Sequence, residues 1–340
     1  MLTEDNFCRI QREMGAEYLS RTCMVYPRNY YFMKGIIYRF CHMSCPEVMD
    51  KLLNDEKSSD LISFPVKDDI PLDASVLDSP EEVKIHPERK YAGDIKDFFY
   101  DIISDKKLPL ETCIILGALA AQSLTKLVEA QDYDRIPEAL KTLKAQMHNG
   151  AQLKSIENIK PNYNINPGIT DKLLREFNTS SKNLKLTFEN GKAKVRNSQT
   201  STSLGFTNED GSVDIDRYIR AKELLEKEFE SRPFAWRNLA LNIMLERNVP
   251  FIVEDKTIFE NYSLFVAVYA VMRHQILTIM GAKDKLEKLD IKMDTKNFII
   301  TFCAVLDRSI SHSSGNLRGL LKTMQEFKIT TPAYLALLVK

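Results

Sequence analysis

The sequence predicts a mostly α-helical protein with a small, irregular, cysteine-rich head and one β-hairpin at about residues 184–196. Two observations carry this prediction. Beyond residue 91, apolar residues recur at the three- and four-residue spacing of a buried helix face. Before it, one short segment contains four of the six cysteines, namely Cys8, Cys23, Cys41 and Cys45. We therefore divide the chain into a cysteine-rich head (1–54), an acidic linker (55–90) and a helical domain (91–340).

The composition is typical of a soluble globular protein, because 44% of the 340 residues are hydrophobic and 28% are charged. Lys+Arg and Asp+Glu both number 47, so the basic excess of a dedicated nucleic-acid binder is missing. No stretch approaches the roughly 20 apolar residues of a membrane helix, and the N-terminus is acidic and polar. We expect a cytoplasmic protein that binds neither nucleic acid nor membrane.

Within the head, apolar residues at helical spacing between 6 and 25 predict a short helix that packs inward. Pro27 ends it. An extended segment follows from Tyr30 to Phe40, rich in aromatic and β-branched residues. A short helix then begins after Cys45. The linker follows, with nine acidic residues and two lysines between Asp55 and Glu82, and is predicted to be solvated and weakly structured.

The helical domain begins at Asp94, a predicted N-cap, before the apolar face formed by Ile95, Phe98, Phe99, Ile102 and Ile103. Further helices are predicted at about 110–130, 136–148, 216–231, 236–247, 254–280, 297–312 and 317–327, with a last one from Pro332. Thr170 is predicted to cap a short helix.

A soft loop is predicted at 178–212, between the helices of this domain. Residues 184–188 alternate in polarity, Asn190-Gly191 is a strong hairpin signal, and Ala193 and Val195 lie on the return strand. No two of the 12 glycines are separated by a single residue, and there is no P-loop or GxSxG motif. A Rossmann-type cofactor domain is therefore not expected.

The spacing of the four head cysteines is C-x14-C-x17-C-x3-C. Thiolates favour zinc and iron–sulfur clusters, so these residues would supply a metal site if the fold brought them together. The alternative is that several are ordinary buried thiols. That alternative is favoured for Cys113 and Cys303, which lie in apolar helical stretches.

Polar groups on the C-terminal helices form a second candidate site. Glu260-Asn261-Tyr262 begins one apolar helix, with Arg273 and His274 further along it. Asp307-Arg308-Ser309 ends another, and Arg308 and His312 share a face at i, i+4. These groups would line a cleft between helices, or they are capped and salt-bridged helix ends. A Ser–His–Asp triad is disfavoured because Ser309, His312 and Asp307 crowd one helix end.

The motifs of the head occur in a recognisable order. They are Cys8-Arg9-Ile10-Gln11, Gly15, Leu19-Ser20-Arg21-Thr22-Cys23, Tyr26-Pro27-Arg28 and Ser44-Cys45-Pro46-Glu47. In this order and spacing the sequence resembles the flagellin lysine-N-methylase (FliB-type) family. Two C-terminal pieces, Glu260-Asn261-Tyr262 and Asp307-Arg308-Ser309-Ile310-Ser311-His312, also resemble that family, the latter its Arg-Ser-x-Ile-Glu-His stretch.

The resemblance implies a bacterial protein-lysine N-methyltransferase that modifies flagellin and uses S-adenosylmethionine as the methyl donor. It also implies a metal centre, most simply a 4Fe-4S iron–sulfur cluster. By motif position, Cys8, Cys23 and Cys45 correspond to its ligands, whereas Cys41 falls outside the family pattern.

The sequence differs from the family pattern in two features. Family members carry a further cysteine-rich segment before the part that matches Cys8, and this sequence starts at Met1. Three cysteines do not fill a four-cysteine site, which would be incomplete, completed by Cys41 or His42, or lost. Ser311 replaces the family's acidic residue, which weakens a catalytic role for that helix end.

Lysine must lose a proton before it attacks the donor methyl group, so a methyltransferase site needs desolvation or a nearby base. Tyr26, Tyr262 and His312 are our candidates for this catalytic role. The candidates for binding the donor, through its carboxylate or polar groups, are Arg28, Arg273, Arg308 and Asn261. The alternatives are a non-catalytic, metal-stabilised helical module that binds flagellin or an export partner, and a truncated, inactive family member.

Overall fold

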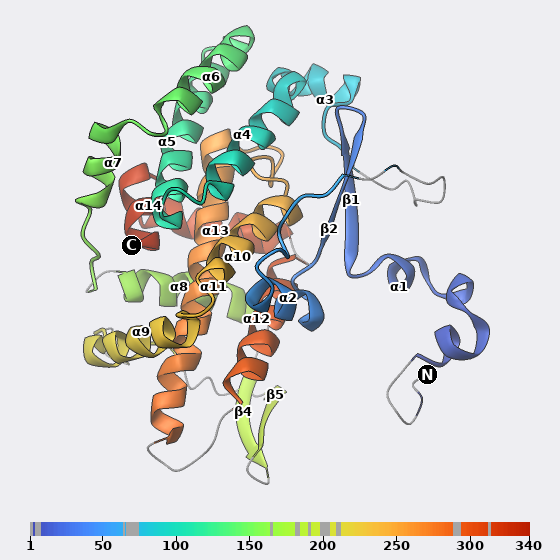
Figure 1. Ribbon diagram of the computed structural model, residues 1–340, viewed down its shortest axis with the longest axis vertical. Helices are drawn as coiled ribbons and strands as arrows, with labels where there is room; N and C mark the ends of the chain where they lie inside the picture. Colours follow the sequence, from blue (N-terminus) through green and yellow to red (C-terminus); the bar gives the residue numbers. More distant parts are fainter. Residues whose placement is uncertain are drawn as a thin grey trace.

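A computed structural model describes residues 3, 8–63, 65, 75–163, 166–180, 184–189, 192–197, 205–208, 212–287, 294–311 and 314–340. The fold is mostly helical, which confirms the predicted class (Figure 1).

The helical body is organised around α11 (Ile258–Glu287), the long helix at its centre in Figure 1. Its side chains are buried almost without interruption from Ile258 to Ala282. A helix that is apolar on all sides is stable in water only when other helices surround it. Its neighbours include α5 (Leu110–Glu129), α9 (Ile215–Phe229), α12 (Thr295–Ser311) and α14 (Pro332–Val339).

Helix α4 (Ala92–Ser104) buries the predicted face of Ile95, Phe98, Phe99, Ile102 and Ile103. The helix begins earlier than predicted, because Tyr91 and not Asp94 is its N-cap. Asp94 instead accepts a hydrogen bond from Lys34 Nζ at 2.6 Å, which ties α4 to the N-terminal strands.

The remaining predicted helices are confirmed with small changes of boundary. They are α6 (Ile136–Gln146), α10 (Phe234–Glu246), α13 (Ser314–Glu326) and the helices around α11 named above. Helix α7 (Gly150–Glu157) was not predicted as a separate element. The capping role of Thr170 is wrong: α8 runs from Asn166 to Ser180, and the Thr170 hydroxyl donates to the Asn166 carbonyl oxygen inside it.

The extended segment 30–40 is an antiparallel hairpin of β1 (Arg28–Met33) and β2 (Ile36–Cys41). Lys34 and Gly35 form its turn with φ of 51° and 70°, the left-handed pair that suits a two-residue hairpin. Strand β3 (Ser75–Val76) lies parallel to β1, so the sheet order is β2-β1-β3. Helix α2 (Pro46–Asn54) follows and packs against α10 and α12.

The prediction of one cysteine-rich head is wrong. Residues before the sheet form two short helical turns, η1 (Ile10–Met14) and η2 (Ala16–Tyr18), and α1 (Arg21–Val25). None of these elements has a buried residue, so the predicted inward packing is also wrong. In Figure 1 this N-terminal arm extends away from the helical body, whereas α2 lies on it. The cysteines are therefore divided between two places.

The acidic segment contains α3 (Pro80–Ile85) and the 3-10 turn η3 (Pro87–Tyr91) in addition to β3. Its first residues also contact the body, since Ser59 Oγ donates to the Asn238 carbonyl at 3.1 Å and Tyr100 Oη donates to the Ser59 carbonyl at 2.9 Å. Where it is described, this segment is attached to the body and is not a free linker.

The predicted hairpin is confirmed. Strand β4 (Leu184–Glu189) pairs antiparallel with β5 (Lys192–Asn197), from Leu184 opposite Asn197 to Glu189 opposite Lys192. Its predicted Asn190-Gly191 turn lies outside the described residues.

Two helices are long and apolar enough to cross a membrane by length and composition, which the sequence analysis did not anticipate. They are Leu110–Glu129 and the Ile258–Lys283 part of α11. Their most apolar windows are 61% and 94% buried inside the protein, as in the core helices of a folded domain.

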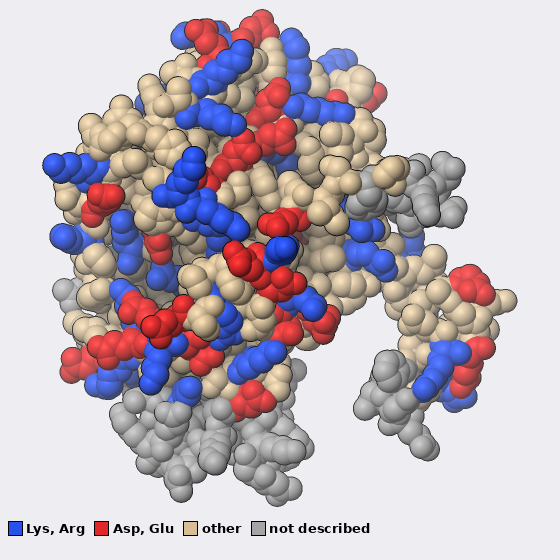
Figure 2. Space-filling view, viewed as in Figure 1, with Lys and Arg blue, Asp and Glu red and all other residues tan. Residues whose placement is uncertain are grey.

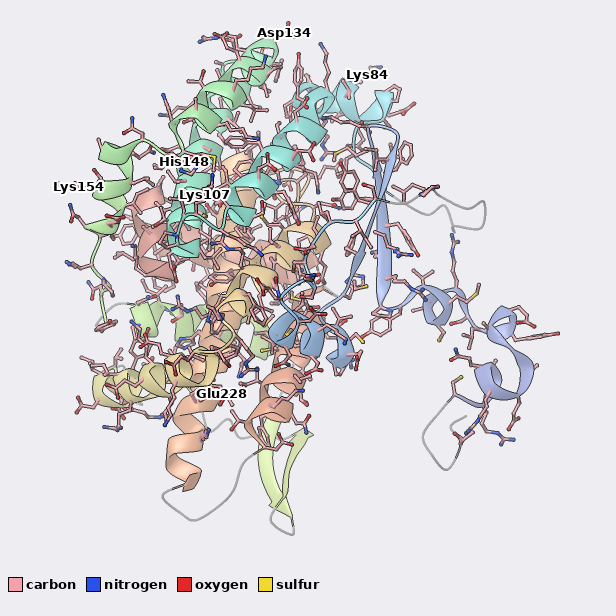
Figure 3. All side chains as sticks on the ribbon, viewed as in Figure 1. Lys84, Lys107, Asp134, His148, Lys154 and Glu228 are labelled. Atoms are coloured by element: carbon pink, nitrogen blue, oxygen red, sulfur yellow. The ribbon has the colours of Figure 1, made fainter. Side chains whose placement is uncertain are left out.

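Acidic and basic side chains are interspersed over the face shown in Figure 2. Figure 3 shows that the labelled side chains of Lys84, Asp134 and Lys154 point outward from the helices at the edge of this view. Among the described residues few charged side chains are buried, and four of them, Lys96, Glu246, Arg247 and Asp307, lie in the candidate site.

Candidate functional site

Three consecutive residues at the C-terminal end of α10 contact three other parts of the chain. Glu246 binds His42 after β2, Arg247 binds Asp307 on α12, and Asn248 binds Lys96 on α4. We call these six residues the α10 junction. The local reason is that α10 ends here: Arg247 is its C-cap, and Asn248 adopts a positive φ of 54°, which asparagine tolerates well.

Glu246 and His42 form the first link. The imidazole Nδ1 lies 2.9 Å from Glu246 Oε1, and the Met43 backbone N–H donates to Oε2 at 3.2 Å. The hydrogen bond to the carboxylate raises the pKa of His42, although burial opposes it. Burial would raise the pKa of Glu246, but the hydrogen bond from His42 and the charge of Arg247 lower it below its ordinary value. The pair is thus an imidazole held against an ionised carboxylate.

Arg247 and Asp307 form the second link, with Nη2 and Oδ1 2.6 Å apart. Both side chains are almost completely buried. Burial, together with the nearby charge of Glu246, raises the pKa of Asp307 to about 7. Two carboxyl groups in one buried place disfavour simultaneous ionisation, which is why the pKa of Asp307 is raised while that of Glu246 is lowered.

Lys96 forms the third link. Its Nζ lies 3.2 Å from Asn248 Oδ1 and 4.1 Å from the centre of the Tyr31 ring. Lys96 is 6% exposed, and burial lowers the pKa of its amine to about 7. Tyr31 is also buried, and its hydroxyl has no hydrogen-bond partner among the described residues. A small pocket here is lined by both residues and by Tyr38 and Tyr100.

The α10 junction is therefore a place where several ionisable groups are displaced from their ordinary pKa values. Such groups are more frequent at catalytic sites than elsewhere, because proton transfer near pH 7 requires them. Among the carboxylate and imidazole groups of the junction, the carboxylates of Glu246 and Asp307 are buried and inaccessible to a bound molecule. His42 has 24% of its side chain exposed, so it is the group through which the junction can exchange a proton with a bound molecule.

Three predicted site residues lie beside His42. The His42 backbone N–H donates to the Pro27 carbonyl at 2.7 Å, and Arg28 is paired with Cys41 in the sheet. Tyr26 Oη lies 3.3 Å from Ser44 Oγ, next to Cys45. The structure thus places Tyr26, Arg28 and Cys45 in the strand ends and turn around His42, although the Arg28 side chain donates to the Met24 carbonyl of α1 at 3.4 Å.

Two other predicted residues lie in the core. Tyr262 is fully buried, and its hydroxyl donates to the Ile114 carbonyl at 3.1 Å, in a space that exists because Gly117 has no side chain. Burial raises its pKa well above the ordinary value. Asn261 binds the backbone of Val253 and Lys256 and holds the turn before α11. In these positions both side chains stabilise the fold and do not face a site.

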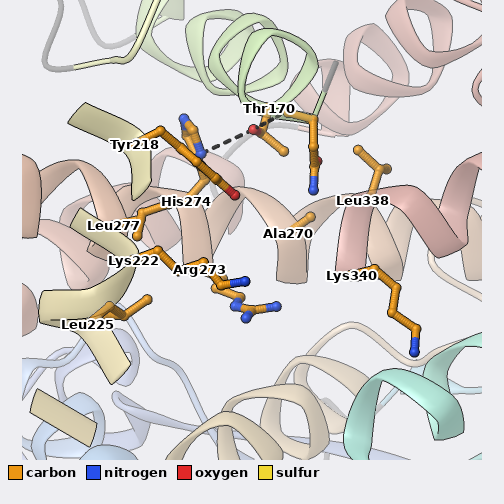
Figure 4. Close-up of a pocket in the computed structure, with 11 residues that line it drawn as sticks. Thr170, Tyr218, Lys222, Leu225, Ala270, Arg273, His274, Leu277, Leu338 and Lys340 are labelled. Atoms are coloured by element: carbon orange, nitrogen blue, oxygen red, sulfur yellow. Dashed lines mark hydrogen bonds between the residues drawn. The ribbon is translucent and has the colours of Figure 1, made fainter. Parts of the chain in front are cut away.

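The remaining predictions are scattered. Arg273 lines a separate pocket, shown in Figure 4, where it donates to the Val339 carbonyl at 2.9 Å. Arg308 is exposed on α12, one residue after Asp307. His312 lies outside the described residues.

The predicted metal ligands do not converge. Cys8 and Cys23 lie on the N-terminal arm and Cys45 at the start of α2. In the described part of the chain, the one group of three or more possible ligands whose donor atoms lie within 4.8 Å of one another is Glu82, His86 and Glu254, which includes no cysteine. A cluster binds several thiolates at one point, so these cysteines, as placed, do not fit it.

The sequence analysis did not identify Glu246, Arg247 or Lys96 as site residues. One signal was present for Lys96, which precedes Phe99 and Ile103 by three and seven positions and so shares their buried helix face. Glu246 and Arg247 lie at the C-terminal end of an apolar helix, shortly before Pro250. Charged side chains at a helix end are ordinarily solvated. The burial of these two residues depends on contacts with α12 and with the β2 strand. The sequence of α10 alone does not show these contacts.

Residues 96–338, more than two thirds of the chain, match the FliB lysine N-methylase C-terminal domain. The chain belongs to this family. The FliB-type resemblance of the sequence is thereby confirmed. The matched region contains every residue of the α10 junction except His42, and it also contains Arg273.

A second similarity is shorter. Over 54 residues, 16% of this chain, the sequence is 41% identical to the flagellar biosynthetic protein FliU of Salmonella muenchen, of which this covers 32%. The same identity and length relate it to the lysine-N-methylases of Salmonella typhimurium and Salmonella choleraesuis, of which 14% is covered. The chain thus aligns with a third or less of each of these relatives. No solved structure matches this FliB-family chain.

Proposed function

We propose that this chain is a protein-lysine N-methyltransferase that modifies flagellin lysines with S-adenosylmethionine as the methyl donor. The observation that carries the proposal is the match of residues 96–338 to the FliB lysine N-methylase C-terminal domain. The flagellar substrate is supported by the names of the FliU and lysine-N-methylase relatives. The donor is supported by the chemistry, because an amine is methylated by an electrophilic methyl group.

In the proposed reaction the neutral Nζ of a flagellin lysine attacks the methyl carbon. The N–C bond forms while the S–C bond breaks, and the thioether product leaves. The amine must first lose a proton, since a lysine in water is protonated at neutral pH. The protein therefore has to supply a proton acceptor at the place where the substrate lysine is bound.

We assign this acceptor to His42, positioned by Glu246. Its Nδ1–H donates to Glu246 Oε1, so the exposed edge of the ring carries Nε2, which lies 3.4 Å from Asn29 Nδ2. The ionised Glu246 stabilises the imidazolium that forms when the ring takes up the proton. Tyr26, whose hydroxyl lies 3.3 Å from Ser44 Oγ two residues after His42, would orient the substrate.

The resemblance implies an iron–sulfur cluster, but the cysteines as placed do not fit one, and no step is derived through it. It would require Cys8 and Cys23 to approach Cys45. We also propose that the protein acts in the cytoplasm, which is supported by its six free cysteines.

The test is to incubate the full chain with purified flagellin and S-adenosylmethionine carrying an isotopically labelled methyl group. Peptide mass spectrometry then locates labelled methyl groups on lysine. Transfer that requires the chain and the donor supports the proposal. Tight flagellin binding without transfer would support the alternative of a non-catalytic module, and neither binding nor transfer would leave flagellin without a role.

A further inference from the structure

A histidine and two glutamates from separate parts of the chain meet beside α3. Glu82 is on α3, His86 is the C-cap of this helix, and Glu254 lies in the turn before α11. Each of the three side chains has a donor atom within 4.8 Å of those of the other two. Imidazole and carboxylate groups are ligands of zinc and of related divalent metals. The three side chains form a candidate metal site that shares no residue with the α10 junction.

The local structure of α3 places two of these ligands on one face. The His86 backbone N–H donates to the Glu82 carbonyl at 2.7 Å, so the two side chains are one helical turn apart. Arg89 Nη1 contacts Glu82 Oε2, and its guanidinium lies 5.9 Å from the centre of the Phe251 ring. A carboxylate has two oxygens, so Glu82 can bind Arg89 and a metal ion together. The Arg89 contacts hold α3 against the segment that carries Glu254.

The third ligand lies on a turn with a fixed backbone. The Asn261 side chain accepts from the Val253 backbone N–H at 2.7 Å and donates to the Val253 carbonyl at 3.1 Å. The Lys256 N–H donates to the same carbonyl at 3.2 Å and closes the turn. Glu254 has 63% of its side chain exposed, so its carboxylate can move while its backbone stays in place. Such a residue can complete a metal site without a change of fold.

His86 has a carboxylate near each of its ring nitrogens. Nε2 lies 3.9 Å from Glu254 Oε1, and Nδ1 lies 3.7 Å from Glu88 Oε1. Both distances exceed the length of a hydrogen bond. Zinc bonds to nitrogen and oxygen are about 2.0–2.2 Å long, so two ligand atoms of a tetrahedral ion lie roughly 3.4 Å apart. The gap between Nε2 and Glu254 Oε1 reaches this value if the exposed carboxylate moves by roughly 0.5 Å.

Glu88 lies where a metal-binding histidine usually has a carboxylate. Such histidines donate their other ring N–H to a carboxylate, a carbonyl or water, which fixes the ring and makes it a stronger ligand. The charges of the group also suit a cation. Glu82, Glu88 and Glu254 contribute three negative charges. Arg89 contributes one positive charge, so two negative charges stay in excess, which a divalent ion balances.

We propose that Glu82, His86 and Glu254 bind a divalent transition-metal ion of the zinc type, with water in the remaining position. The imidazole favours such an ion over Mg²⁺ and Ca²⁺, which prefer oxygen ligands. Glu254 lies within the region that matches the family domain, whereas Glu82 and His86 precede it. The ion would therefore join the acidic segment to the family domain. This inference goes beyond the proposed function and does not depend on it.

The test is titration of the chelator-treated full chain with Co²⁺, a coloured substitute for Zn²⁺, followed by displacement with Zn²⁺. We expect a visible spectrum of nitrogen and oxygen ligation, without an intense thiolate charge-transfer band. His86→Gln and Glu254→Gln should each weaken Co²⁺ binding by about tenfold or more. Glu81→Gln, which changes an exposed glutamate on α3, is the matched control and should stay within about twofold of wild type. Circular dichroism and the Tm check the folding of each variant.

Glu254→Gln keeps the test decisive if His86→Gln does not fold, because Glu254 is exposed on its turn. The same Co²⁺ affinity in wild type and Glu254→Gln would overturn the inference, as would the absence of bound Co²⁺. A spectrum that consists only of a thiolate band and disappears with Cys45→Ala would overturn it too, because the cysteines would then hold the metal. Binding of Mg²⁺ but not of Co²⁺ would overturn the choice of a transition metal.

Discussion

His42 Nδ1 lies 2.9 Å from Glu246 Oε1 although 204 positions of sequence separate the two residues. This hydrogen bond joins the end of the N-terminal hairpin to the end of α10, within the FliB-family domain. Asn242 strengthens the same connection, because its side chain donates to the Cys41 carbonyl at 3.2 Å. The N-terminal strands are thus part of the structure that forms the α10 junction.

Substitution of Glu246 by glutamine should destabilise the protein. The variant keeps the shape of the side chain but removes the charge that faces His42 and Arg247, both of which remain at the junction. Removal of one partner from a buried ion pair typically costs about 3–5 kcal/mol, and the retained amide should reduce this to roughly 2–4 kcal/mol. Urea denaturation measures the free energy of unfolding.

The control for this variant is Glu326→Gln, which changes an exposed residue that lies 3.9 Å from Lys322. An exposed pair contributes little, so we expect a change within about 0.5 kcal/mol. Equal effects of the two substitutions would show that Glu246 does not hold the junction together.

Lys96 gives the protein a specific pH dependence. Its pKa is about 7 in the folded state and 10.5 as the ordinary value. Below pH 7 the amine is protonated in both states, and its burial penalty is fully present. Between pH 7 and about 10 the unfolded chain holds more protons, so stability rises with pH. One proton corresponds to about 1.4 kcal/mol per pH unit, or roughly 2 kcal/mol between pH 7 and 9.

Lys96→Met should lose that increment, which is measured as the difference in free energy of unfolding between pH 9 and pH 7. Lys141→Met, at an exposed position of α6, should retain it. An identical increment in wild type and Lys96→Met would mean that Lys96 is solvated and charged.

Tyr262→Phe distinguishes a core role from a catalytic one. The substitution removes the hydroxyl that donates to the Ile114 carbonyl and leaves the ring in place. The expected loss of stability is about 1 kcal/mol, with the rate of methyl transfer unchanged in the folded variant. A folded variant with normal affinity for flagellin and a rate reduced by more than about tenfold would place Tyr262 at the reacting atoms.

The arrangement of the cysteines predicts the metal content. Because Cys8 and Cys23 lie on the arm and Cys45 on α2, anaerobically purified chain should contain much less iron and sulfide than one cluster per molecule. Elemental analysis and an absorption spectrum measure this directly. Stoichiometric iron and sulfide that disappear with Cys23→Ala would show that the arm folds back to gather its thiolates, as the family resemblance implies.

The helical body was predictable from sequence because each helix carries its own apolar face. Ile95 to Ile103 and the apolar length of α11 specify burial locally, and Pro109 marks the start of α5. The turn at Lys34-Gly35 was missed because only the glycine is a turn signal. The site was harder, since His42, Glu246 and Asp307 come from three distant segments and meet only through tertiary packing.

Among the predicted site residues, those near His42 were chosen by motif order, and those in the core were chosen by their place at the start of an apolar helix. Tyr26, Arg28 and Cys45 belong to one stretch of strand and turn, so their proximity follows from local structure. Tyr262 and Asn261 stand at the start of an apolar helix, where polar side chains serve equally well as hydrogen-bond partners of the core backbone. Sequence alone does not distinguish these two uses.

The most direct test of the account is the rate of methyl transfer to flagellin by wild type, His42→Gln and His148→Gln. His148 is an exposed histidine 3.2 Å from Asp105, and it serves as the matched control (Figure 3). If His42 accepts the lysine proton, its loss should slow transfer by about a hundredfold or more, and His148→Gln should stay within about twofold of wild type. Transfer by folded His42→Gln at the wild-type rate would contradict the assignment of the α10 junction as the catalytic site.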